Sequence, residues 1–198
     1  MKRITFMLMA LAILATGCQK GREFTVTGDL ASVGLPDFAD SLAIMSEMID
    51  APLTAAVKND AFQFEGKVKK PAFAKLTIPG WEDRFSKPFI LEEGNIVFQD
   101  GYASGTPLND AINQFYGRIP EILRENRQNP EAGFKALEDA FFSFVALHKN
   151  DPCATLAILK SVTLLPADSV VRLIESASPK IQEDENVRAW KAKMQKAQ

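Results

Sequence analysis

The sequence predicts an α+β protein: an antiparallel β-sandwich or open barrel of about eight strands, followed by an α-helical region of about five helices. Two observations predict this division. Up to residue 105, short segments alternate apolar and polar residues with a period of two and are separated by turn residues. From residue 106 onward, apolar residues recur every three to four positions, as on one face of a helix. We therefore expect an all-β domain at 23–105 and a helical region at 106–198.

The first 17 residues are predicted to be a signal peptide. Lys2 and Arg3 supply a positive start, and residues 4–15 are nearly all apolar. About 12 apolar residues are too few for a transmembrane helix, which needs roughly 20. Small residues precede Cys18, and this pattern resembles a bacterial lipobox, which implies cleavage before Cys18 and acylation (for example palmitate) of its thiol. The alternative is an ordinary signal peptide followed by a chance cysteine.

Residues 18–22 are then the lipidated cysteine and a short polar tether. Gln19, rather than Asp, follows the cysteine. In Gram-negative sorting, this resemblance implies the outer membrane, and the absence of an acidic cluster after the cysteine favours the periplasmic face. We therefore expect a protein of the cell envelope, lipid-anchored in the outer membrane and facing the periplasm.

Turn residues divide the β domain into its strands. The clearest signal is a hairpin across Asn59-Asp60, because both residue types accept the backbone angles of tight turns. Pro71, Pro79-Gly80 and Glu93-Gly94 mark further breaks. The predicted strands are residues 24–30, 42–48, 54–58, 62–68, 72–78, 88–92, 95–99 and 102–103.

Three predicted helices begin with the same chemistry: Thr106-Pro107, Asn129-Pro130 and Asp151-Pro152. The first side chain can accept a hydrogen bond from a free backbone N–H, and proline tolerates the first helical position. Pro120 should kink or split the first of these helices. The apolar positions place the helices at residues 108–123, 134–148, 154–162, 170–174 and 183–195.

Composition excludes several function classes. The chain has 23 basic and 25 acidic residues, and without Lys2 and Arg3 the balance is −4, unlike the basic surface of nucleic-acid-binding proteins. His148 is the single histidine, so a multi-histidine metal site or a histidine-based triad is excluded unless chains combine. The P-loop, dinucleotide, HExxH and GxSxG motifs are also absent, so the sequence predicts no catalytic residue, metal or cofactor.

Cys153 is the one candidate for a reactive thiol. It lies in the first turn of a predicted helix, where the helix N-terminus can lower a thiol pKa. The alternative, which we favour, is a small buried apolar residue, because no second thiol is left to resolve an oxidised form. His148 is expected to end a helix, and Glu92 and Glu93 are expected to be solvated at a hairpin tip.

Trp81 and Phe85 are candidate partner or ligand contacts. They lie in a predicted loop among mixed charges, and loop aromatics frequently anchor a binding partner. The alternative is that both rings fold back onto the core.

The β half resembles the N-terminal domain of unknown function found ahead of thioredoxin-like (AhpC/TSA and TlpA-type) domains in Gram-negative envelope lipoproteins. The helical half, at His148-Lys149-Asn150-Asp151-Pro152, is similar to the linker helices that precede the thioredoxin domain. The segments that carry the resemblance in the β half are Phe24-Thr25-Val26-Thr27-Gly28, Asn59-Asp60-Ala61-Phe62-Gln63-Phe64-Glu65-Gly66, Pro71-Ala72-Phe73-Ala74, Phe89-Ile90-Leu91-Glu92-Glu93-Gly94-Asn95 and Ser104-Gly105-Thr106-Pro107-Leu108-Asn109.

The sequence ends where the thioredoxin domain of such proteins would begin, so the resemblance transfers no active-site residue to this chain. We therefore expect a non-catalytic binding or accessory module that works with a thioredoxin-like partner. Two alternatives remain: a thiol-dependent redox protein that uses Cys153, and a structural remnant of a longer thioredoxin-like protein.

Overall fold

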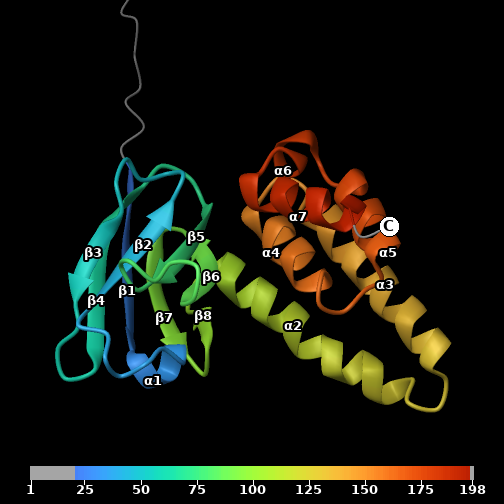
Figure 1. The fold of residues 1–198 in the computed structure, drawn as a ribbon, viewed down its shortest axis with the longest axis horizontal. Coiled ribbons are helices and arrows are strands. Elements are labelled where there is room, and N and C mark those ends of the chain that lie inside the picture. Colours follow the sequence, from blue (N-terminus) through green and yellow to red (C-terminus); the bar gives the residue numbers. More distant parts are fainter. Residues whose placement is uncertain (1–20, 197–198) are drawn as a thin grey trace, which may run out of the picture.

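A computed structural model describes residues 21–196, so the predicted signal peptide and Cys18 lie outside the described residues. Within this range the protein is α+β, as the sequence predicts, with eight strands in two sheets and seven helices rather than about five (Figure 1). The strands occupy residues 22–104, and six of the helices follow them. Within residues 21–196, no helix combines the length and apolar character needed to cross a bilayer.

The strands form a sandwich rather than a closed barrel. Neighbouring strands are antiparallel, except that β1 (Arg22–Asp29) and β7 (Gly94–Gln99) run parallel. The first sheet, in spatial order, is β4 (Ala61–Val68), β1 (Arg22–Asp29), β7 (Gly94–Gln99) and β8 (Tyr102–Ser104). The second sheet is β3 (Leu53–Ala56), β2 (Ser41–Ser46), β5 (Ala72–Thr77) and β6 (Ser86–Leu91).

The predicted hairpin turn is present before β4. Asn59 and Asp60 both have positive φ angles, of 50° and 63°. Lys58 and Ala61 exchange two backbone hydrogen bonds across the turn. Two consecutive left-handed residues match the right-handed twist of the flanking strands, which explains why Asn-Asp occupies this position.

Strands β5 and β6 of the second sheet are covered on both faces. One face packs on the first sheet, where side chains such as Leu76 and Leu91 are fully buried. The other face carries Phe73 and Ile90, which belong to the core of the helical half. A sheet covered on both faces needs consecutive apolar residues rather than strict alternation, and β5 and β6 have them.

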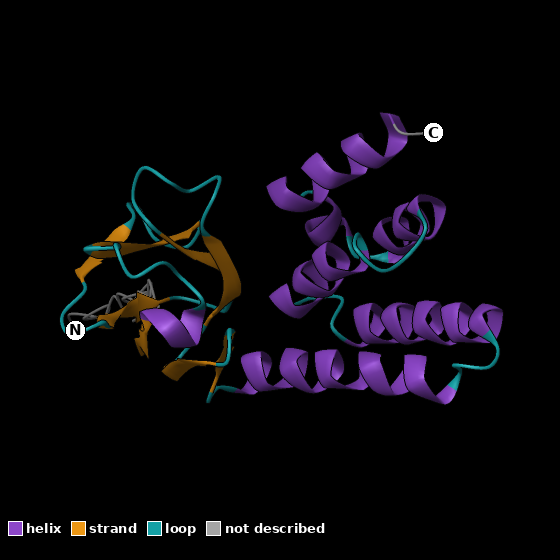
Figure 2. Cartoon of the chain, turned by 60° about the horizontal axis from the view of Figure 1, so that its bottom comes forward, coloured by secondary structure: helices purple, strands orange, loops and turns teal. Residues whose placement is uncertain are grey.

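Helices α2 (Pro107–Glu125) and α4 (Pro152–Ser161) contact the second sheet, and α2 and α3 (Pro130–Leu147) lie antiparallel and side by side (Figure 2). Two short helices, α1 and α6, were not predicted, because four residues are too few to show a helical period. The helices are α1 (Leu30–Val33), α2 (Pro107–Glu125), α3 (Pro130–Leu147), α4 (Pro152–Ser161), α5 (Ala167–Ser176), α6 (Pro179–Gln182) and α7 (Glu185–Lys196).

The structure differs from the local predictions at two positions. Leu30, predicted to end the first strand, begins α1, because the Asp29 carboxylate accepts the Ser32 N–H at 2.7 Å and starts a helical turn. Of the two outcomes predicted at Pro120, a kink or a split, the split does not occur, because α2 continues through the proline as one helix. Ile119 is buried on one side of the proline and half-buried Ile122 packs on the same core from the other, so tertiary packing holds the helix together across the break.

Candidate functional site

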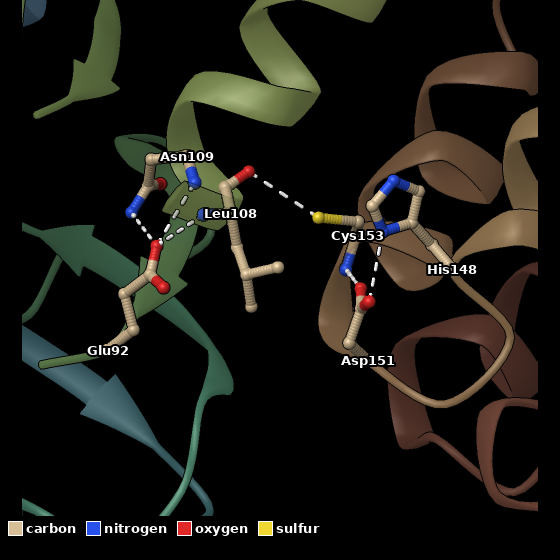
Figure 3. A network of polar contacts seen from close by, with 6 residues as sticks. All are labelled: Glu92, Leu108, Asn109, His148, Asp151 and Cys153. Atoms are coloured by element: carbon tan, nitrogen blue, oxygen red, sulfur yellow. Dashed lines mark hydrogen bonds and ion pairs between the residues drawn. The ribbon is translucent and has the colours of Figure 1, made fainter. Parts of the chain in front are cut away.

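The junction between the β half and the helices is a buried polar network around Glu92 (Figure 3). Glu92 follows β6 and is only 5% exposed, so the prediction of a solvated side chain was wrong. Its Oε1 accepts the backbone N–H groups of Leu108 and Asn109, at 2.9 and 3.1 Å. These are free N–H groups of the first turn of α2, where a carboxylate is also favoured by the helix dipole. Glu92 therefore caps α2 in place of Thr106, whose side chain makes no cap bond.

Asn109 completes this network. Its side-chain oxygen accepts the Ile90 N–H at 3.0 Å, and its amide nitrogen donates to the Ile90 carbonyl at 2.7 Å. The same amide nitrogen also contacts Thr106 Oγ1 and Glu92 Oε1. Asn109 thus satisfies the backbone of β6 as another strand would, and it fixes α2 to the edge of the second sheet.

Cys153 reaches the same junction from α4. Its side chain is fully buried, and its Sγ lies 3.4 Å from the Leu108 carbonyl oxygen, to which the thiol donates (Figure 3). Burial raises the pKa of the thiol, and the nearby carboxylates of Asp151 and Glu92 raise it further. The thiol is therefore protonated at neutral pH. A helix N-terminus can lower a thiol pKa, but here burial and the nearby carboxylates raise it.

His148 and Asp151 form the turn between α3 and α4. His148 is the residue after α3, as predicted, and its Nδ1 lies 2.9 Å from Asp151 Oδ2. The other carboxylate oxygen of Asp151 accepts the Cys153 N–H at 2.9 Å and caps α4. Donor atoms of His148, Asp151 and Cys153 lie within 4.8 Å of one another. The helix cap and the thiol hydrogen bond already account for this arrangement, so it does not by itself indicate a metal site.

The predicted loop aromatics belong to a cluster that we call the aromatic triad: Phe38, Trp81 and Phe85. The ring centroids are 5.9 to 6.1 Å apart in all three pairs. Phe38 and Trp81 are 56% and 42% exposed, whereas Phe85 is half-buried against the sandwich core. The guanidinium of Arg84 lies 5.3 Å from the Trp81 ring centroid. Two of the three rings therefore offer apolar surface to solvent, and Phe85 supports them from below.

The aromatic triad lies at the end of the sandwich opposite to the start of β1. β1 begins at Arg22 and runs to α1, and Phe38 follows α1 in the chain (Figure 1). Trp81 and Phe85 lie in the loop between β5 and β6, which contacts Phe38 at this same end. Four exposed carboxylates flank the triad in the sequence: Asp37, Asp40, Glu82 and Asp83.

Sequence reasoning missed Phe38, although an aromatic residue between Asp37 and Ala39 in a loop was the available signal. It also missed the roles of Glu92 and Asn109, because their meaning depends on where α2 docks. No family model, curated protein or solved structure was found to match this chain.

Proposed function

We propose that this chain is an exported, lipid-anchored envelope protein that acts as a non-catalytic binding module and contacts a protein partner through the aromatic triad. The observation that carries the proposal is the position of Phe38 and Trp81, which are exposed at the end of the sandwich farthest from the start of β1. Exposed aromatic residues on a rigid support are typical anchors of protein interfaces.

The predicted anchor gives this position a meaning. Cys18 precedes Gly21 by three residues, so acyl chains on its thiol would hold the start of β1 close to the bilayer surface. β1 has eight residues, which span roughly 23 Å at about 3.3 Å per residue. The aromatic triad would then face away from the membrane, where a protein partner can reach it.

The charge around the aromatic triad favours a particular kind of partner. Four carboxylates flank the three rings in the sequence, with Arg84 as the cation against Trp81. A complementary surface would have an apolar centre with basic residues around it. The resemblance described above makes a thioredoxin-like envelope protein the first candidate to test.

The thiol-dependent alternative has less support. A redox thiol needs access to its substrate and a stabilised thiolate, whereas Cys153 is fully buried and its pKa is raised by that burial. If the chain is a structural remnant of a longer protein, the aromatic triad should contact no partner, and photo-crosslinking at position 38 tests this.

The anchor is tested by mass spectrometry of the protein purified from its native host. We expect an N-terminal peptide that starts at Cys18 and carries diacylglycerol and a further acyl chain. The Cys18→Ser chain should lose stable membrane attachment. An unacylated terminus at Met1 on cytosolic protein would contradict the proposal.

The binding surface is tested by photo-crosslinking in the same host. A photoreactive phenylalanine analogue at position 38 should give discrete crosslinked proteins, and Trp81→Ala should weaken those bands. The matched control places the analogue at Leu147, which is 77% exposed on the helical half. If position 38 yields no discrete adduct, or the same adducts as position 147, the aromatic triad is not the contact.

A further inference from the structure

A cavity of about 290 Å³ lies where the β half meets the helices, and it is separate from the aromatic triad. Its walls come from three parts of the chain: the segment from β6 to β8, the first half of α2, and the end of α4. Exposed Tyr102 and Thr163 lie at its rim, and buried Phe89, Ile112 and Leu156 line its interior. This volume is at the lower end of the range for small-molecule pockets and suits a ligand of one or two rings.

The charge in this cavity has one sign. Among the described residues that line it, Lys160 is the single charged side chain, and the lining includes no Asp or Glu. Lys160 is half-buried and makes no ion pair with any residue in the described part of the chain. Its Nζ lies 5.7 Å from the ring centroid of Tyr116. The ammonium group of a half-buried lysine without a carboxylate partner is suited to an anion.

The other polar groups of the lining are largely engaged. Asn109 is committed to β6 and Glu92, as described above, and Asn113 donates to the Ala103 carbonyl at 2.7 Å. Tyr116 donates its hydroxyl hydrogen to the Leu156 carbonyl at 3.0 Å, and burial raises its pKa, so the phenol stays neutral. Lys160 is therefore the principal group that can select a ligand by charge.

The apolar part of the lining favours a ring. Tyr102 and Tyr116 have ring centroids 6.4 Å apart, and Phe89 adds a third aromatic side chain. Aromatic side chains bind other rings through offset or edge contacts in addition to apolar burial. We propose that this cavity binds a small aromatic carboxylate, with its ring packed against the two tyrosines and its carboxylate on Lys160. This site is independent of the protein contact proposed above.

The test uses residues 19–198, which contain both cores that the structure describes, and two matched probes: 2-naphthoate and its neutral analogue 2-naphthamide. We expect saturable one-to-one binding of 2-naphthoate, about tenfold tighter than that of the amide. Methyl NMR signals of Ala103 and Ile112 should shift during the titration.

Lys160→Met keeps most of the apolar side chain and removes its charge, so it should abolish the preference for the carboxylate. The control Lys135→Met removes an exposed lysine of α3 that pairs with Asp139, and it should keep the preference. Thr163→Trp, at an exposed position of the rim, should weaken binding of both probes by blocking the entrance. Urea unfolding of each variant confirms that it is folded.

Three results would overturn the inference. The first is no saturable binding of 2-naphthoate up to about 1 mM, the weak end of specific affinity. The second is a set of shifted methyl signals that excludes Ala103 and Ile112. The third is a folded Lys160→Met protein that still prefers the carboxylate.

Discussion

Glu92→Ala tests whether the buried network holds the two halves together. The substitution leaves the N–H groups of Leu108 and Asn109 without the acceptor that lies 2.9 and 3.1 Å away. Each buried donor without a partner costs about 1–3 kcal/mol. Two such donors would together cost about 2–6 kcal/mol. Water can enter the space left by the side chain and bind them, so we expect the unfolding free energy to fall by about 3 kcal/mol, in the lower part of that range.

Two variants separate this cap from a general effect of charge. Glu92→Gln keeps an acceptor oxygen and should cost about 1 kcal/mol, the difference between a charged and a neutral acceptor. Glu93→Ala removes the adjacent carboxylate, whose ion pair with Arg22 is largely exposed, and should cost less than about 0.5 kcal/mol.

The assay is equilibrium urea unfolding followed by far-UV circular dichroism. With a slope of about 2 kcal/mol per molar urea, Glu92→Ala should lower the midpoint by about 1.5 M and leave the slope unchanged. Equal midpoints for Glu92→Ala and Glu93→Ala would refute the reasoning, because the buried and exposed carboxylates would then contribute alike.

Three further predictions concern single positions. Cys153 should not react with Ellman's reagent at pH 8 in folded protein but should react fully in urea. Because its folded pKa is raised, the contribution of the thiol to stability is complete below the ordinary thiol pKa of about 8.5 and should decline as the pH rises above that value. This decline should be absent in Cys153→Ala. Gly105→Ala should lower the unfolding free energy by about 1–3 kcal/mol, because its φ is +87° and a Cβ would lie 2.7 Å from a backbone oxygen of β7. Gly117→Ala, in open space on α2, should raise it by about 0.5–1 kcal/mol. Changes of the same sign in the two variants would contradict this prediction. Phe141→Ala should lower the unfolding free energy by about 3–5 kcal/mol because the ring is fully buried, and Phe134→Ala, at 54% exposure on the same helix, should change it by less than about 0.5 kcal/mol.

The strands were predictable because each depends on local features. All eight predicted strands are present, with ends that shift by a few residues, since turn residues such as Asn59-Asp60 and Pro79-Gly80 mark their limits. The long helices were predictable for the same reason, because Asn129 and Asp151 cap α3 and α4 as their residue types suggest. The short helices α1 and α6 were not predictable, because four residues are too few to show a helical period of apolar residues.

The site was less predictable because its residues are distant in the sequence. Glu92 is followed by Glu93 and Gly94 at a hairpin, and only the docking of α2, some 16 residues later, makes it a buried cap. The cavity combines Tyr102, Tyr116 and Lys160 from a strand and two helices. No local pattern reports such a meeting point, whereas the exposed loop that holds Trp81 could be recognised by composition alone.

The second sheet shares Phe73 and Ile90 with the helical core, and this has a practical consequence for work on fragments. A protein that ended near residue 105 would present both side chains to water, where each loses about 1.5–3 kcal/mol of favourable burial. Such a fragment should self-associate through this exposed apolar surface. Swapping either half for a homologue's would fail for the same reason unless both sides of the contact were exchanged together.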